Sequence, residues 1–299
     1  MRIGTRGSAL AVAQAERVAA RIAARAGATV ELVIIRTTGD RLADASLVDA
    51  GGQGLFTKEI EDALREGRVD AAVHSLKDLP TELPAGLVLG AVPEREDPSD
   101  ALVAAPGATL ATLARGARVG TSSPRRRAQL LAARRDLEIV EIRGNVPTRL
   151  ERQARGDVDA VVLARAGLVR LGLEARIAEV IATSTMLPAP GQGAIAVEIR
   201  DDDRSARAVC EAIDDAGARA ATTAERALLA ALGGGCRLPV GALAVRDGVR
   251  LRLRACVAEL DGESLLIDEE SGYPADPEAI GRRLAERLLA RGAFAKEAR

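Results

Sequence analysis

The sequence predicts two α/β lobes, joined by two crossings of the chain, and a smaller α+β domain in its last third. Three observations support this fold class. Strand and helix patterns alternate over the first 93 residues and restart after a charged, proline-flanked break at residues 94–98. A second break at residues 187–193 precedes one further apolar strand. The last third has three consecutive strand patterns between two helices, which is typical of an antiparallel sheet.

The length of 299 residues exceeds what one ordinary core can organise, so several domains are expected. We expect residues 1–93 and 194–212 to form the first lobe and residues 99–187 to form the second. Residues 216–299 are expected to form the third domain. The apolar strand at 194–199 should return to the first sheet, so that two crossings join the lobes and a cleft lies between them.

In the first lobe, short apolar runs predict strands and a 3.6-residue periodicity predicts helices. Ser8 is expected to cap the first helix, which has Leu10, Val18 and Ile22 on its apolar side. The expected strands cover residues 2–4, 30–36, 69–74 and 87–92, and the expected helices cover 9–26 and 57–66. Such alternation indicates a mainly parallel sheet with helices on both faces.

The second lobe repeats this alternation. Pro124 stands in the first turn of a predicted helix, where its missing N–H costs nothing. The expected strands cover 117–121, 138–143 and 158–164, and the expected helices cover 123–133 and 147–155. In the third domain, Asp247-Gly248 indicates a hairpin turn. Its expected strands cover 240–245, 249–257 and 264–271, between helices at 218–232 and 276–290.

The composition excludes several classes of protein. Apolar residues make up 47% and charged residues 28%, as in globular proteins. The formal net charge of −1 gives no global attraction for a polyanion, so an anion site must be built locally from clustered arginines. Only three of the 42 basic residues are lysines, an excess of arginine that we attribute mainly to coding bias. Aromatic residues are 1%, too few for a stacking platform on single-stranded nucleic acid.

The cysteines and the apolar runs bear on the compartment. Cys210, Cys236 and Cys256 are too widely spaced for a disulfide framework or a zinc site, which fits a reducing compartment. The apolar run near the N-terminus is too short for a signal peptide, and no uninterrupted apolar stretch could span a bilayer. We expect a cytoplasmic protein that binds no membrane.

Three turns rich in small residues carry arginine or serine between a predicted strand and a predicted helix. They are Gly4-Thr5-Arg6-Gly7-Ser8, the segment from Gly120 through Ser123, Arg125 and Arg126 to Arg127, and Arg143-Gly144-Asn145-Val146-Pro147-Thr148-Arg149. The carboxyl edge of such a sheet is where ligands bind, and helix N-termini attract anions there. One such turn alone could be ordinary, but three together favour a polyanion site. Phosphate and carboxylate ligands both remain open.

Two further segments contain reactive residue types. His74-Ser75-Leu76-Lys77-Asp78 ends a predicted strand, and Asp78 there could stabilise a cation or accept a proton. His74 is more often a structural residue, and Lys77 with Asp78 could be a surface ion pair. Cys236 follows three glycines on a predicted turn, where a thiol would be exposed, whereas Cys210 and Cys256 fall within a helix and a strand.

Taken together, the motifs make the chain resemble the hydroxymethylbilane synthase (porphobilinogen deaminase) family from Arg2 to about Gly292. The matching segments, in the family's order and spacing, are Ile3-Gly4-Thr5-Arg6-Gly7-Ser8, Gly51-Gly52-Gln53-Gly54-Leu55-Phe56, His74-Ser75-Leu76-Lys77-Asp78, Arg95-Glu96-Asp97-Pro98, Gly120-Thr121-Ser122-Ser123-Pro124-Arg125-Arg126, Arg143-Gly144-Asn145, Pro190-Gly191-Gln192-Gly193 and Gly234-Gly235-Cys236. The resemblance implies two periplasmic-binding-protein-like lobes and a third α+β domain with the cysteine loop.

The resemblance also implies an activity. The family joins four porphobilinogen molecules to a covalent dipyrromethane primer, loses one ammonia in each step, and releases the linear tetrapyrrole with water. It implies a thioether from the primer to Cys236, Asp78 as the catalytic residue, and no metal. The implied cofactor- and substrate-binding residues are Arg6, Ser8, Phe56, Lys77, Ser123, Arg125, Arg126, Arg143, Arg149 and Arg170. The implied partners are porphobilinogen and uroporphyrinogen-III synthase, which would receive the product, and we expect a monomer.

The chain departs from the family at two positions. Gln53 and Asp49 stand where many relatives have lysines, which puts that segment's share of carboxylate binding in doubt, but not the reaction. Two rival hypotheses are a solute-binding protein without catalysis and a nucleic-acid binder using Arg125-Arg126-Arg127. The first needs no cysteine-bearing third domain. The second is disfavoured by the net charge and the scarcity of aromatic residues.

Overall fold

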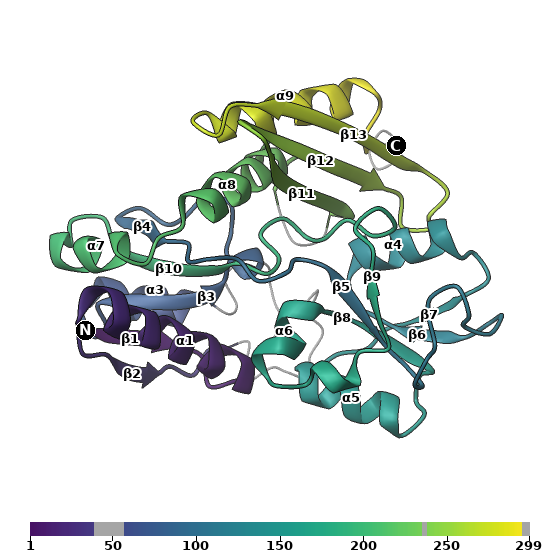
Figure 1. The fold of residues 1–299 in the computed structure, drawn as a ribbon, viewed down its shortest axis with the longest axis horizontal. Coiled ribbons are helices and arrows are strands. Elements are labelled where there is room, and N and C mark those ends of the chain that lie inside the picture. The colour runs from purple at the N-terminus through teal and green to yellow at the C-terminus, as the bar shows by residue number, and fades with distance from the viewer. Residues whose placement is uncertain (39–56, 235–237, 295–299) are drawn as a thin grey trace. The chain divides into compact units, whose positions relative to one another are not determined.

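The computed structural model describes residues 1–38, 57–234 and 238–294 (Figure 1). The chain divides into two compact units. The first unit, which we call the first lobe, consists of residues 1–96 and 193–219. The second unit consists of residues 97–192 and 220–299; its two parts, the second lobe and the third domain, each have a sheet of their own.

The first lobe has a five-stranded sheet in the order β2-β1-β3-β10-β4. Its strands are β1 (Arg2–Thr5), β2 (Glu31–Ile34), β3 (Ala71–Ser75), β4 (Leu87–Ala91) and β10 (Ile195–Arg200). Strand β1 pairs in parallel with β2 and β3, whereas β10 runs antiparallel to β3 and β4. The predicted return of the strand after residue 193 to this sheet is therefore confirmed.

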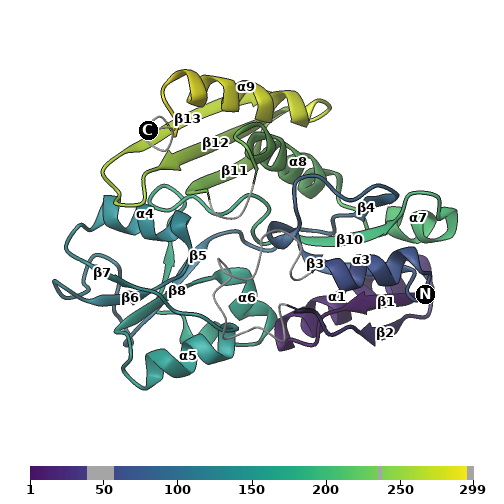
Figure 2. The ribbon, with the colours of Figure 1, turned by 180° about the vertical axis from the view of Figure 1, so that it is seen from behind.

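Helices cover both faces of the first sheet because successive strand residues point to opposite sides. Helices α1 (Ala9–Ala26) and α7 (Arg204–Glu211) pack on one face, in a cluster that contains Val18, Val73 and Cys210. Helix α3 (Lys58–Arg65) packs on the other face, with Ile60 and Ala72 (Figure 2).

The second lobe repeats this topology with the sheet order β7-β6-β8-β5-β9. Its strands are β5 (Asp100–Val103), β6 (Arg118–Gly120), β7 (Glu138–Val140), β8 (Ala160–Ala164) and β9 (Glu179–Ile181). The central strand β6 is parallel to β7 and β8, and β5 is antiparallel to β8 and β9. In each lobe, the antiparallel strand is the first one after the chain has crossed from the other unit.

The helices of the second lobe also lie on both faces of its sheet. Helix α4 (Pro124–Ala133) contributes Leu130 to one core cluster. Helices α5 (Val146–Ala154) and α6 (Arg165–Arg170) contribute Leu150 and Leu168 to the other, and the 3-10 helix η2 (Glu174–Arg176) follows α6.

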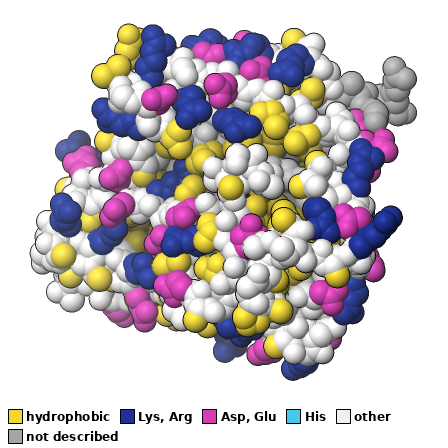
Figure 3. Space-filling model, turned by 45° about the vertical axis from the view of Figure 1, so that its right-hand side comes forward, with side chains coloured by type: hydrophobic (Ala, Val, Ile, Leu, Met, Phe, Trp, Pro, Cys, Tyr) yellow, Lys and Arg dark blue, Asp and Glu magenta, His cyan; other side chains and the backbone are white. Residues whose placement is uncertain are grey.

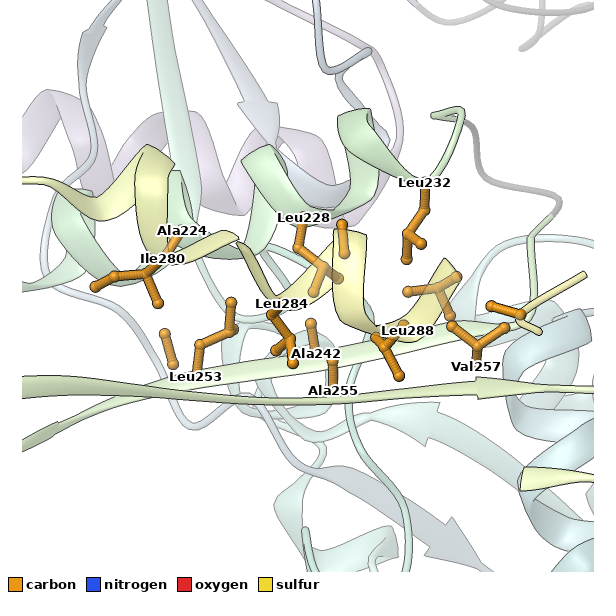
Figure 4. Packing of buried hydrophobic residues seen from close by; sticks show 14 of the residues in the cluster. Ala224, Leu228, Leu232, Ala242, Leu253, Ala255, Val257, Ile280, Leu284 and Leu288 are labelled. Carbon is orange, nitrogen blue, oxygen red and sulfur yellow. The ribbon is translucent and has the colours of Figure 1, made fainter. Parts of the chain in front are cut away.

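The third domain is a three-stranded antiparallel sheet under two helices. Its sheet consists of β11 (Val240–Asp247), β12 (Arg250–Ala258) and β13 (Leu265–Gly272) in that order. Figure 4 shows side chains of α8 (Ala216–Ala231) and α9 (Pro277–Ala290) packed onto this sheet. A Cβ on Gly281 would lie 2.4 Å from the carbonyl oxygen of Ala224, so the close approach of the two helices requires glycine there.

The third domain packs against helix α4 of the second lobe. A Cβ on Gly262 would lie 2.6 Å from the backbone nitrogen of Ala132, and Arg127 Nε donates to the Leu260 carbonyl at 3.3 Å. A buried glutamate adds a second contact between the third domain and residues 97–192. Glu225 of α8 accepts hydrogen bonds from the backbone N–H groups of Gly191 and of Ala244 on β11. Both parts therefore belong to one unit.

Most of the expected elements are confirmed, with shifted ends. Ser8 caps α1 through a bond from Ala11 N, and Gly248 has the positive φ of a hairpin turn. Strands β5 and β9 and helices α6 and α7 were not predicted from the sequence. They have three to eight residues.

Candidate active site

In the first lobe, the candidate residues lie at the carboxyl ends of β1 and β3. Arg6 and Ser8 follow β1, and Lys77 and Asp78 lie in the 3-10 helix η1 (Leu76–Asp78), which follows β3. Because β1 and β3 are parallel neighbours, their carboxyl ends share one edge of the sheet.

A buried glutamine links the two segments at this edge. Gln14, on α1, donates from Nε2 to Ser75 Oγ at 2.9 Å and is 3% exposed. The N–H of Leu76 donates to the Ala194 carbonyl, which holds the start of η1 against β10. Lys77 is half-buried and Asp78 is exposed. The carboxylate thus stands at the surface of a firmly held turn.

In the second lobe, the candidate residues follow β6, β7 and β8, which are also parallel neighbours. Ser123 caps α4 by accepting from Arg126 N at 3.4 Å, with Pro124 in the first turn as predicted. Arg170 ends α6, the helix that follows β8. The two lobes therefore place their candidate residues at equivalent edges of equivalent sheets.

The turn after β7 is shaped by its glycine and asparagine. Gly144 has φ of 100°, and Asn145 caps α5 by accepting from Thr148 N at 3.0 Å. Arg149 donates from Nε to the Gly144 carbonyl at 2.8 Å, and Arg143 forms an ion pair with Glu141. Both arginines are half-buried, so part of each residue is accessible to solvent.

Arg125 and Arg126 are buried and share the carboxylate of Asp100. Arg125 Nη1 donates to Asp100 Oδ2 and to the Leu187 carbonyl, both at 2.7 Å. Arg126 donates to Asp100 Oδ1 from Nε at 3.0 Å and from Nη2 at 2.7 Å, and its Nη1 donates to the Val162 carbonyl. The sequence had marked both arginines but not their acidic partner.

The charges of this cluster are fixed by its surroundings. Burial opposes ionisation of Asp100, but Arg125 and Arg126 outweigh it and hold the pKa of that carboxyl well below its usual range. Two guanidinium groups facing one carboxylate leave one positive charge in excess. Arg125 Nε is buried and finds no hydrogen-bond partner among the described residues. An anionic ligand could supply one.

His74 belongs to a buried cluster on the α3 side of the first sheet. Its Nε2 lies 3.3 Å from Glu198 Oε2 on β10, and Glu61 of α3 interacts electrostatically with both side chains. Burial, with a smaller contribution from Glu198, raises the pKa of Glu61. His74 is 6% exposed, which favours the structural role weighed for it above.

Glu61→Gln is expected to change how stability depends on pH. The folded state holds the Glu61 proton more tightly than the unfolded state, so the free energy of unfolding of the parent falls as pH rises through that window. The variant lacks this loss, so its free energy of unfolding should rise relative to that of the parent as pH increases above the ordinary titration range of a glutamate. Urea unfolding across this range measures it, with exposed Glu66→Gln as control; parallel curves for parent and Glu61→Gln would contradict the prediction.

The two described cysteines are buried and unreactive. Cys210 lies in α7 and Cys256 in β12, and both are fully buried, as the sequence suggested. Burial raises the pKa of Cys210 to about 12 and that of Cys256 to about 11, so neither carries much thiolate near neutral pH. Cys236, Phe56, Gln53 and Asp49 lie outside the described residues.

Basic and acidic side chains are interspersed over the face shown in Figure 3. Such a surface does not concentrate phosphate groups as a basic patch does, which disfavours nucleic-acid binding there. Within the described ranges, no group of three or more His, Cys, Asp or Glu side chains could hold a metal ion. No helix in the same ranges is long and apolar enough to cross a membrane.

Two residues that contact the arginine pair or its carboxylate, Asp100 and Gln192, were not identified as site residues from the sequence. The sequence signal for both is weak. Asp100 begins a short apolar strand, and Gln192 lies in the proline- and glycine-rich break. Strand β5 is antiparallel, so its first residue, Asp100, pairs with Ala164 at the carboxyl end of β8. A charge at the start of an apolar run, just after a crossing, is the feature that could have identified it.

Comparison with known proteins places the chain in a family. Residues 1–208 match the family model "Porphobilinogen deaminase, dipyromethane cofactor binding domain", and residues 220–290 match the model of the C-terminal domain of the same enzyme. The chain is 55% identical to a porphobilinogen deaminase of Rubrobacter xylanophilus, over 97% of this chain and 94% of the relative. It is 52% identical to that of Moorella thermoacetica, over 98% and 94%.

Solved structures show a more distant likeness. A periplasmic substrate-binding protein of an ABC transporter from Coxiella burnetii is 18% identical, with a TM-score of 0.44, over 71% of this chain and 91% of that one. The fold class follows instead from the two equivalent sheets and the separate third sheet. The family models and the close relatives both extend over nearly the whole length, and the chain belongs to the porphobilinogen deaminase family.

Proposed function

We propose that the residues at the carboxyl edges of the two sheets carry out the family's transferase reaction. Four porphobilinogen molecules are condensed head to tail on a dipyrromethane primer, and hydroxymethylbilane is released with water. The observation that carries this proposal is the placement of Arg6, Lys77 and Asp78 in one lobe and of the arginine turns in the other, all at equivalent ligand edges. Porphobilinogen consumption, ammonia release and mass spectrometry of the product test it; a chain that loads the primer but releases no tetrapyrrole would contradict it.

The residues present fit a primer that carries carboxylates. Each pyrrole bears an acetate and a propionate, and the Arg125–Arg126–Asp100 cluster has one positive charge in excess. The buried Nε of Arg125 lacks a partner among the described residues, and a carboxylate oxygen would complete it. When bound, the dipyrromethane supplies the free pyrrole α-carbon to which the first substrate is joined.

Asp78 is proposed to stabilise positive charge on the substrate. Departure of ammonia from the aminomethyl arm leaves a cation whose charge spreads over the pyrrole N–H. An exposed carboxylate on a turn held by Gln14 and Ala194 needs little reorganisation to meet it. Lys77 beside it would bind a substrate or primer carboxylate.

The covalent attachment is assigned to Cys236. The two other cysteines are fully buried and have raised pKa values, so they are poor nucleophiles. Cys236 directly follows Gly234-Gly235 in the sequence, in the segment that resembles the family's cofactor loop. A cytoplasmic location, a monomeric state and transfer of the product to uroporphyrinogen-III synthase complete the proposal; the first rests on the cysteine pattern and the other two on the family resemblance.

Replacing single arginines by leucine is expected to separate two roles. Arg125→Leu or Arg126→Leu should purify largely without primer and melt at lower temperature, because a bound ligand stabilises the native state. Arg143→Leu or Arg149→Leu should carry the primer but stall with one to three added pyrroles. Each lost Arg–carboxylate bond costs about 1.5–3 kcal/mol. Intact mass after brief exposure to porphobilinogen distinguishes the classes.

The matched control for these variants is Arg155→Leu. Arg155 follows α5, its side chain is 73% exposed, and its contact with Glu151 is long at 4.0 Å. This variant should load and turn over like the parent. Normal loading and turnover in all four of the other variants would refute the proposed binding of carboxylates.

A further inference from the structure

The carboxylate of Asp100 is fully buried and accepts hydrogen bonds from three side chains. Arg125 binds Oδ2, while Arg126 and Gln192 bind Oδ1, the latter from Nε2 at 3.0 Å. Among the residues that the structure describes, no other acidic side chain forms an ion pair with either arginine. Asp100 is therefore the counter-charge that fixes the orientation of both guanidinium groups.

The same contacts reach the two points where the chain crosses between the units. Gln192 is the last residue before the chain returns to the first unit, and its Nε2 also donates to the Pro98 carbonyl at 2.7 Å. Pro98 is the second residue after the chain enters the second unit, and Asp100 follows two residues later. One carboxylate and one amide thus join both crossings to the arginine pair.

The second crossing is also tied to α4 upstream of Gln192. The Leu187 carbonyl accepts from Arg125 Nη1 and from Gln129 Nε2, and the Leu187 N–H donates to Gln129 Oε1 at 2.8 Å. Arg125 and Gln129 lie one turn apart on α4. Movement of Arg125 would therefore disturb the path of residues 187–192.

We propose that Asp100 is a positioning residue, which holds Arg125 and Arg126 ready for the carboxylates of the primer. Through these contacts, Asp100 also couples the binding of the primer by the two arginines to the path of the chain at both crossings. The proposal rests on the proposed function, in which these arginines bind the dipyrromethane. Asp100 does not touch the reacting atoms. Its effect on the reaction passes through the two guanidinium groups.

Asp100→Asn keeps the size of the side chain and removes its charge. Two like charges then remain buried side by side, and the amide offers one acceptor oxygen to two guanidinium groups that shared two. We expect the rate of primer assembly from porphobilinogen on the cofactor-free protein to fall about 10- to 100-fold. Molecules that have loaded the primer should keep the parent's kcat, because Asp78 and Lys77 are unchanged.

Asp159→Asn is the matched control. Asp159 pairs with Arg118 at 2.9 Å in the same lobe, but at the amino ends of β6 and β8, and its side chain is 45% exposed. Assembly on this variant should proceed at the parent's rate. Intact mass against time gives the assembly rate, and thermal unfolding of the cofactor-free proteins gives stability separately.

A double-mutant cycle keeps the test decisive if Asp100→Asn folds poorly. Arg126→Gln in the Asp100→Asn background returns the cluster to the parent's single excess positive charge and should restore folding. Arg125 then keeps its bond to the Leu187 carbonyl but has lost its carboxylate partner, so the double variant should assemble the primer more slowly than Arg126→Gln alone. Equal rates for these two proteins would overturn the proposal.

The outcomes separate this proposal from the one it rests on. If Arg125→Leu and Arg126→Leu load the primer normally, the two arginines do not bind it. The part of the proposed function that assigns primer binding to them is then rejected. If those variants fail to load while Asp100→Asn loads at the parent's rate, only the positioning role of Asp100 is rejected. A loss of kcat in loaded Asp100→Asn molecules would also reject it, because Asp100 would then act in the chemical steps.

Discussion

Cys236→Ser is expected to give a purified protein with the bare mass of its sequence and no activity. The parent should be heavier by two pyrrole units, which a thioether at Cys236 holds. A serine hydroxyl is a far weaker nucleophile than a thiolate at neutral pH, so the primer cannot attach. Without it, the first porphobilinogen has no acceptor carbon, and the loss of turnover should be complete.

The matched control is Cys210→Ala. The Cys210 thiol is fully buried in α7, and its high pKa keeps it protonated. This variant should lose some stability through the removed side chain but keep the mass of the two added pyrroles. Peptide mapping of the parent locates the adduct, and an adduct on Cys210 or Cys256 would overturn the assignment to Cys236.

Asp78→Asn is expected to keep the fold and the primer and to lower turnover by ~10²–10³. The amide has nearly the same size as the carboxylate but cannot offset positive charge developing on the substrate. Because Asp78 is exposed at the end of η1, little packing energy is lost, and thermal stability should stay close to that of the parent. Initial rates of porphobilinogen consumption, corrected for the loaded fraction by intact mass, measure the effect.

Asp62→Asn serves as the control for charge removal in the same lobe. Asp62 lies on α3 with its side chain 42% exposed and pairs only loosely with Arg65, at 3.5 Å. This variant should turn over normally. Asp78→Glu retains the charge at an altered distance and should recover part of the activity. Parent-like kinetics for Asp78→Asn would remove Asp78 from the mechanism.

Short-range signals allowed most of the fold to be predicted. The Ser8 cap, Pro124 in the first turn of α4 and the Asp247-Gly248 hairpin depend on residues within four positions of one another. The return of β10 to the first sheet could also be predicted, because an apolar strand after a proline- and glycine-rich break has to be buried. The candidate turns were found because strand-to-helix turns of a parallel sheet share one edge.

The residues that organise the candidate site could not be predicted in this way. Asp100 is 25 positions before Arg125 and 92 before Gln192, and no local pattern relates them. Their contact exists because β5 is inserted antiparallel beside β8, which brings its first residue to the carboxyl edge. Glu225 likewise meets Gly191 and Ala244 only after three segments have packed together.

The sequence by itself therefore determined most of the element types and the turns that carry arginine, serine and aspartate, and it singled out Cys236 as the candidate for attachment. Only the tertiary structure decided that Arg125 and Arg126 are buried around one carboxylate and that this carboxylate reaches both crossings of the chain. The physical reason is the separation along the chain of the residues that interact. Caps and turns are stabilised by neighbours along the chain, whereas a buried charge is stable only where distant segments supply its partners.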